Sequence, residues 1–240
     1  YTSKVQGSTP IIVNNLFETR NHSSYYGTGG ITSNGEVIFD GGQNYGTMVF
    51  NNLGNDTISG AFTNSLNATA TFNSNLNFNG FNFSGAGGNA YLNGDLNFIQ
   101  NNSLFQTKNL TIVGDLICNV DSAKIVTFGG NDGVMSMHGM HIQNGKLKLE
   151  KNLEIDELII DSNGILDIGC TKNLTFTGSV LTNNGLTLGC GSSASYLLFN
   201  NTLNQSLLGN GRIARLKVDK INGQFNLDQH QLVNNSRFIK

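Results

Sequence analysis

The chain has no tryptophan, a single proline and few charged residues. Charged side chains make up 12% of its 240 residues, which is about half the usual share for a globular domain. The net charge of −2 provides no basic surface for nucleic acid or for an anionic membrane. No run of about 20 apolar residues could span a bilayer. We therefore expect neither a nucleic-acid partner nor a membrane span.

The motifs that usually carry chemistry are missing as well. The sequence contains no phosphate-binding glycine loop, no zinc-ligand spacing and no nucleophile elbow. We therefore expect no enzyme activity, no cofactor and no metal. Met135, Met137, His138, Met140 and His141 lie close together and could form a copper site, but alternation favours a structural role in which His138 faces solvent.

Cysteine is scarce, with only Cys118, Cys170 and Cys190. Cys170 and Cys190 close two similar segments and hold the same place in consecutive repeats. On stacked strands they would lie about 4.8 Å apart, near the lower limit for a disulfide. The packing of cysteine favours two stacked, buried thiols, and a disulfide is the alternative. Cys118 is left over, and we expect it to be buried.

What the chain has in abundance is asparagine, with 37 residues, and glycine, with 30. Four segments restart in the same way at Asn109, Asn131, Asn152 and Asn173, and a nearly constant step of this kind indicates a repeat architecture. Apolar and polar residues alternate within each segment, which is the period of a strand. A strand-rich repeat of about 21 residues is typical of one coil of a β-solenoid.

This pattern predicts an all-β fold with about 20–22 residues per coil. We expect identical asparagines in successive coils to hydrogen-bond to one another in ladders. Asn-Gly pairs such as Asn163-Gly164 and Asn184-Gly185 should form the corners. The side chains expected to point inward are Leu110, Ile112, Leu153, Ile155, Leu166, Ile168, Leu174, Phe176, Leu186 and Leu188.

Residues 1–30 differ from the rest, because they hold Pro10 and show no visible echo of the repeat. We expect 1–30 to be an N-terminal cap and 31–240 to be the β-solenoid, since an open coil exposes unpaired backbone groups. At the other end, 231–240 still has the pattern of turn and strand. We therefore expect either that the chain is a fragment of a longer protein or that its copies associate end to end, and the second alternative is slightly favoured. The residues predicted at the two assembly ends are Ile11, Ile12, Val13, Tyr25, Tyr26, Phe238 and Ile239.

The repeated units Asn-Leu-x-Ile and Asn-Gly-x-Leu-x-Leu, with the stretch 211–227, resemble a known group of proteins. They are similar to the repetitive β-solenoid proteins of bacterial surfaces, such as autotransporter passengers and the repeat adhesins of gliding bacteria. The resemblance covers roughly residues 70–230. It implies a single right-handed parallel β-helix, export to the cell surface and an adhesive or structural role. The group has no fixed site motif, so no functional residue carries over.

Acidic residues gather in the second half of the chain, and two interpretations of them differ in function. The residues are Asp115, Asp121, Asp132, Glu150, Glu154, Asp156, Glu157, Asp161 and Asp167. The favoured interpretation is a solvated outer face, paired across coils with lysines such as Lys146 and Lys148. The alternative is a groove that cleaves acidic polysaccharides with grouped carboxylates.

The sequence thus predicts a secreted, non-enzymatic structural or adhesive solenoid that forms a filament or part of a surface fibre. Its partners would be other copies of the chain, and a glycan or a cell-surface receptor. The alternative is a carbohydrate-binding or polysaccharide-cleaving β-helix. The tyrosines are scattered along the sequence, which favours the structural or adhesive solenoid over the carbohydrate-binding β-helix.

Overall fold

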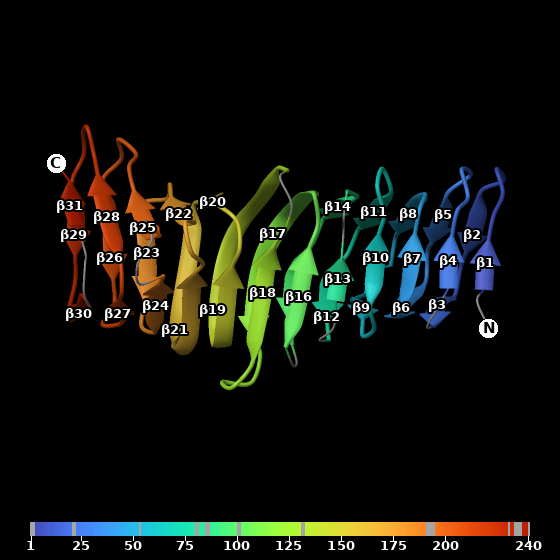
Figure 1. Cartoon of the computed structure of the whole chain (residues 1–240), viewed down its shortest axis with the longest axis horizontal. Helices are drawn as coiled ribbons and strands as arrows, with labels where there is room; N and C mark the ends of the chain where they lie inside the picture. The colour runs from blue at the N-terminus through green and yellow to red at the C-terminus, as the bar shows by residue number, and fades with distance from the viewer. Residues whose placement is uncertain are drawn as a thin grey trace. The chain divides into compact units, whose positions relative to one another are not determined.

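The computed structural model shows a solenoid built only of β-strands in the part of the chain that it describes (Figure 1). The described residues are 3–20, 23–52, 54–79, 82–84, 87–99, 102–130, 133–190, 195–229, 231–232 and 237–239. Strands pair in parallel with strands of the next coil. The chain divides into two compact units. Unit 1 comprises residues 1–116 and 129–135, and unit 2 comprises 117–128 and 136–240.

Unit 1 has three faces, and each face is a parallel sheet with one short strand per coil. The first face is formed by β2 (Ile11–Val13), β5 (Ile31–Ser33), β8 (Thr47–Phe50), β11 (Thr69–Phe72), β14 (Asn89–Leu92) and the start of β17 (Asn109–Asn119). The second is formed by β3 (Leu16–Arg20), β6 (Glu36–Asp40), β9 (Asp56–Ile58), β12 (Leu76–Phe78) and β15 (Leu96–Phe98). The third is formed by β1 (Ser3–Val5), β4 (Ser23–Tyr25), β7 (Gly42–Asn44), β10 (Phe62–Asn64), β13 (Asn82–Ser84) and β16 (Ser103–Gln106).

Unit 2 repeats the three-faced plan with longer strands at its start. One face is formed by β20 (Leu153–Ile155), β22 (Asn173–Phe176), β25 (Tyr196–Phe199), β28 (Leu216–Asp219) and β31 (Arg237–Ile239). β19 (Met135–Leu149) and β21 (Glu157–Ile168) each bend around a corner and serve both other faces. One of these continues through β23 (Val180–Asn183), β26 (Gln205–Leu208) and β29 (Phe225–Leu227). The other includes β18 (Ile125–Gly129), β24 (Leu186–Gly189), β27 (Arg212–Ile213) and β30 (Gln231–Leu232).

The interior of unit 1 is filled by phenylalanine. Alternate residues of each strand point inward, so equivalent aromatic rings in successive coils meet. The rings of Phe50 and Phe72 stack with centroids 4.9 Å apart, and those of Phe83 and Phe105 with centroids 4.5 Å apart. The fully buried rings of this unit are Phe39, Phe50, Phe62, Phe72, Phe78, Phe83, Phe98 and Phe105. Aromatic contacts of this kind add to the stabilisation that burial alone provides.

The interior of unit 2 is mostly leucine and isoleucine, with the rings of Phe128, Phe176 and Phe199 between them. The predicted inward set is confirmed at eight of its ten positions, two of which lie in unit 1 and six in unit 2. The confirmed residues are Leu110, Ile112, Leu153, Ile155, Leu166, Ile168, Leu174 and Phe176. The alternation of the sequence therefore identifies the inward face of most strands.

The prediction is wrong for Leu186 and Leu188, which face outward while Thr187 is buried between them. Leu186 pairs with Ile165 and Thr187 with Leu166, so the register follows the Asn-Gly corners and not the leucines. The cause is a close backbone contact. A Cβ atom on Gly185 would overlap the carbonyl oxygens of Gly164 and Asp161, so only glycine fits there.

Within the predicted cap, 1–30, the described residues form strands like those of the coils that follow. β1 pairs with β4, and Ile11 of β2 pairs with Ile31 of β5, 20 positions later. An echo of the repeat therefore does exist here, although the sequence did not reveal it, because serine, threonine and glycine occupy many of its positions. Strand pairing does not separate this segment from its neighbours, and its capping role stays a prediction.

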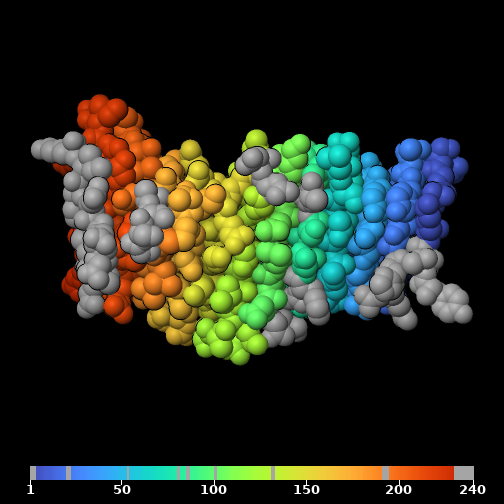
Figure 2. All heavy atoms as spheres, in the orientation of Figure 1, coloured from blue at the N-terminus to red at the C-terminus, as the bar shows by residue number. Residues whose placement is uncertain are grey.

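Ladders of asparagine run along the outside of unit 1, as the sequence predicts. Asn34 donates to the side-chain oxygen of Asn14 over 3.0 Å, and Asn51 donates to that of Asn34 over 3.2 Å. Asn73 continues this column by donating to Asn51 over 2.6 Å, and Asn93 donates to Asn73. We call these five residues the asparagine ladder. Figure 2 shows successive coils within each unit as adjoining bands of colour.

Candidate functional site

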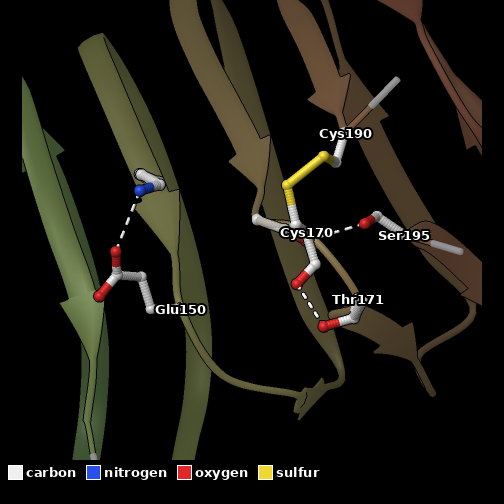
Figure 3. The surroundings of a disulfide bond; sticks show 7 residues. Glu150, Cys170, Thr171, Cys190 and Ser195 are labelled. Carbon is white, nitrogen blue, oxygen red and sulfur yellow. Dashed lines mark hydrogen bonds and ion pairs between the residues drawn. A yellow bond between two sulfur atoms is a disulfide. The ribbon is translucent and has the colours of Figure 1, made fainter. Parts of the chain in front are cut away.

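A disulfide joins Cys170 and Cys190 at a corner of unit 2 (Figure 3). Their Cα atoms are 4.8 Å apart. Buried thiols were favoured by the packing argument, but Cys170 is exposed and Cys190 is only partly buried. The reason is that β21 ends at Ile168 and β24 at Gly189, so both cysteines follow the last inward position and lie outside the core.

Cys118 behaves as the sequence predicts. Its side chain is fully buried, and its sulfur contacts the carbonyl oxygen of Asn144 at 3.7 Å. Burial raises the pKa of this thiol to about 12. The thiolate, which is the reactive form, is therefore strongly disfavoured, and Cys118 is part of the core.

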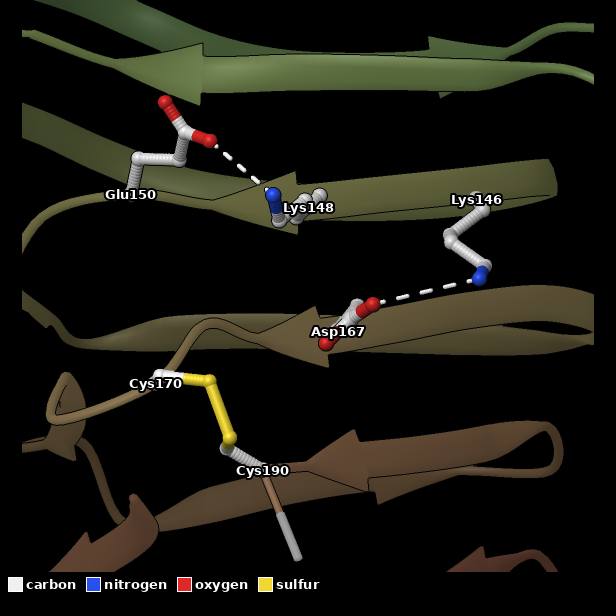
Figure 4. Close-up of polar contacts among 6 residues, drawn as sticks. All are labelled: Lys146, Lys148, Glu150, Asp167, Cys170 and Cys190. Carbon is white, nitrogen blue, oxygen red and sulfur yellow. Dashed lines mark hydrogen bonds and ion pairs between the residues drawn. A yellow bond between two sulfur atoms is a disulfide. The ribbon is translucent and has the colours of Figure 1, made fainter. Parts of the chain in front are cut away.

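Several acidic residues of unit 2 are paired with basic groups on its outer surface. Lys146 in β19 lies 3.8 Å from Asp167 in β21, which confirms pairing across coils (Figure 4). Lys148 instead contacts Glu150 of its own coil at 3.0 Å. His138 is exposed, as predicted, with its Nδ1 atom 3.9 Å from a carboxylate oxygen of Glu157. Asp132 lies outside the described residues.

The two histidines of the Met/His segment contact separate acidic side chains. His138 contacts the carboxylate of Glu157, and His141 contacts that of Asp161. Among the described residues, no group of three or more His, Cys, Asp or Glu side chains is placed to hold a metal ion. The two histidines therefore belong to the polar outer surface.

An open hollow on unit 2 surrounds Asp161. It has a volume of about 580 Å³ and is lined by polar residues from successive coils: Gln143, Asp161, Ser162, Asn163, Asn184 and Asn210. We call it the Asp161 hollow. Asn163, Asn184 and Asn210 each precede a corner glycine, and the strand register places them in one column. The Asn-Gly corners therefore create this surface.

Hydrogen bonds hold the carboxylate of Asp161 in place. The Nε2 atom of His141 lies 2.9 Å from its Oδ2 atom. The side-chain amide of Gln143 lies 3.4 Å from Nδ1 of the same ring. An amide that donates to Nδ1 leaves the ring proton on Nε2, where it is donated to Asp161. The ring of His141 thus links Gln143 to Asp161, and both of these residues line the hollow.

A buried carboxyl group in unit 1 was not predicted. Asp56 is fully buried and occupies the inward row in which Val37, Leu76 and Leu96 stand in neighbouring coils. Ser74 donates to its Oδ2 atom over 3.1 Å, and Asn52 donates to its Oδ1 atom over 3.4 Å. Burial raises its pKa from 3.8 to about 6, against the opposing effect of these two hydrogen bonds.

Two tyrosines from neighbouring coils are stacked on unit 1. The rings of Tyr26 and Tyr45 lie 4.1 Å apart and nearly parallel, and the ammonium group of Lys4 sits 4.5 Å from the Tyr26 ring centroid. The tyrosines are thus less scattered than the sequence indicates. Each ring therefore covers one face of the other.

The residues predicted at the N-terminal assembly end differ in burial, and their role in assembly stays a prediction. Ile11 and Val13 are partly buried and lie in the inward row of the first coil, whereas Ile12 points outward and is 65% exposed. Tyr25 is buried in the next coil and Tyr26 lies in the outer stack. β31 contains Phe238 and Ile239 and pairs with β28, but their side chains lie outside the described part.

The comparisons with known proteins add no relationship. No family model, curated protein or solved structure matches the chain. Within the described residues, no helix is long and apolar enough to cross a membrane.

Proposed function

We propose that this chain is an extracellular, non-enzymatic structural or adhesive solenoid of a bacterial cell surface. The observation that carries the proposal is the exposed disulfide between Cys170 and Cys190, which ties neighbouring coils together. Disulfides persist in oxidising compartments and are rare in the cytosol. The low charge and the ladders of uncharged amides agree with a protein whose coils serve as a scaffold.

The compartment is tested by the thiol content of the protein isolated from its native source with alkylation at lysis. We expect one alkylated cysteine per chain, which is Cys118 once unfolding exposes its buried thiol. We also expect an antibody against the chain to label the surface of intact cells. Three alkylated cysteines and no surface labelling would contradict an extracellular location.

End-to-end association is the second part of the proposal. Its support is the first coil of unit 1, where the inward-pointing Val5 is 43% exposed and Ile11, Val13 and Phe17 are only partly buried. A hollow of about 280 Å³ opens beside Val5 and Phe17. A β-coil of a second copy would pair with this edge and cover these side chains.

Sedimentation at rising concentration tests this association. We expect larger species as concentration increases, and their loss when Val13 is replaced by lysine. Ile12→Lys is the matched control, because Ile12 already points to solvent. A monomer at every concentration, or equal effects of the two variants, would contradict association through this edge.

The absence of enzyme activity is also a proposal. The carboxylates of Glu150, Glu157, Asp161 and Asp167 each contact a basic side chain in the structure, as expected for a charged outer face. Incubation with pectin, alginate and chitin fragments should release no oligosaccharide. Release that disappears in Asp161→Asn would instead support the polysaccharide-cleaving alternative.

A further inference from the structure

We propose that the Asp161 hollow binds an extended, uncharged, hydroxyl-rich polymer such as a neutral glycan. This inference deepens the adhesive part of the proposed function and rests on it. Without a binding site, this surface of unit 2 would contribute to adhesion only through its shape. The hollow gives it a defined position and a class of ligand.

First, the side-chain amides of the asparagines that line the hollow are not used in hydrogen bonds within the described chain. The side chains of Asn163, Asn184 and Asn210 are exposed, and they form no hydrogen bond with other described residues. The asparagine ladder of unit 1 is different, because there the stacked amides bond to one another. The column in the hollow therefore keeps its donors and acceptors available to a ligand.

The second argument is the chemistry of the lining. An amide side chain both donates and accepts hydrogen bonds, as a sugar hydroxyl group does. The Asp161 carboxylate accepts from hydroxyl groups, and His141 holds it in position at 2.9 Å. Among the described residues that line the hollow, Asp161 alone carries a formal charge, so an anionic ligand is disfavoured. These features favour a neutral partner with many hydroxyl groups.

The third argument is the length of the column. Parallel strands of neighbouring coils are about 4.8 Å apart, so three asparagines in successive coils span about 10 Å. A chain that runs across the coils could contact all three, whereas a single small molecule could not. The hollow is shallow and the lining residues include no aromatic ring, so we expect weak binding, with a Kd of about 1 mM for short probes.

The experiment uses the full chain labelled with nitrogen-15 and three neutral probes, maltohexaose, cellohexaose and mannohexaose. We expect at least one probe to shift the side-chain amide signals of Asn163, Asn184 and Asn210 in a saturable manner. Replacing all three with serine should weaken binding at least tenfold. Asn222→Ser is the matched control, since Asn222 is exposed and also precedes a glycine but lies outside the hollow.

Asp161→Asn provides a second variant that keeps the shape of the side chain, in case the triple replacement disturbs folding. It should weaken binding as well, with an otherwise unchanged spectrum. The proposal is overturned if no probe shifts these signals at about 10 mM, a concentration tenfold above the expected Kd. It is also overturned if binding persists unchanged in both variants.

Adhesion of cells that display the chain is measured in parallel. Adhesion that survives in the triple variant would refute the role of the hollow and leave the proposed function standing. Probe binding without any adhesion would refute the adhesive function and leave the binding site standing.

Discussion

Units 1 and 2 use the same three-faced coil but stabilise it by different means. Unit 1 stacks phenylalanine rings inside and bonds asparagines into a ladder outside. Unit 2 has mostly leucine and isoleucine inside, and a disulfide, ion pairs and unbonded corner asparagines outside. The comparison indicates that coil geometry depends on alternation and corner glycines, whereas the side chains at each position are free to specialise.

The largest effect should come from removing a core ring of unit 1. Phe72→Ala leaves a cavity between stacked rings, so we expect a loss of about 3–5 kcal/mol in the free energy of unfolding. Leu166→Ala in unit 2 should cost about 2–5 kcal/mol. Urea denaturation measures both. If Phe72→Ala costs no more than an ordinary surface substitution, about 0.5 kcal/mol, the ring stack does not stabilise unit 1.

Loss of the disulfide should weaken unit 2 and leave unit 1 unaffected. It closes a loop of about 20 residues, so Cys170→Ser with Cys190→Ser should cost about 2–4 kcal/mol. Hydrogen exchange can report each unit separately. Equal loss of protection in both units would contradict the assignment of this bond to unit 2 alone.

Asp56 gives unit 1 a pH dependence that its aromatic core would not produce. The folded-state pKa of about 6 exceeds the ordinary value of 3.8, so the folded chain favours the protonated carboxyl group. The stability that the protonated Asp56 carboxyl group contributes to the folded chain is therefore fully present below pH 3.8 and is lost as pH rises through 6. A difference of about two pKa units corresponds to roughly 3 kcal/mol.

Asp56→Asn removes the titrating group but keeps its shape and polarity. We expect this variant to be more stable than the natural chain at pH 8, by up to roughly 3 kcal/mol, and equally stable at pH 3.5. Thermal unfolding across this pH range measures the difference. A constant difference at all pH values would mean that the carboxyl group does not titrate in this way.

The smallest effects should come from the outer asparagines, and they should differ between the units. Asn73→Ala removes hydrogen bonds to both Asn51 and Asn93, so a loss of about 1–2 kcal/mol is expected. Asn184→Ala removes no bond within the described chain and should change stability by less than about 0.5 kcal/mol. Equal effects would remove the distinction between a structural ladder and an available binding column.

Much of the fold could be predicted from the sequence, because strand alternation and the length of the repeat are properties of local sequence. The register between paired strands of neighbouring coils was harder to predict. At Leu186 and Leu188 the hydrophobic pattern and the Asn-Gly corner disagree by one residue, and the corner prevails because backbone contact is less adjustable than a side chain. The outward position of Leu186 could have been predicted from the spacing of the Asn-Gly pairs.

Features that depend on neighbouring coils were not predictable from one segment alone. Tyr26 meets Tyr45 and Asp56 replaces an apolar residue only because of the register between coils. The Asp161 hollow likewise requires residues from several coils and the ring of His141. The sequence did point to Asp161 as one of several acids and to Asn163 and Asn184 as corner residues, but not to their gathering around one hollow.

The offset between paired residues varies from coil to coil while the pairing stays parallel. Ile31 pairs with Met48, 17 positions later, and Leu181 pairs with Leu207, 26 positions later. Each coil thus restores its alignment at the next sheet, and a change in the length of one turn does not propagate along the stack. Insertions at the outer corners should therefore be tolerated, which would allow such a chain to acquire new recognition loops by mutation, or a protein engineer to graft peptides there, without redesigning the interior.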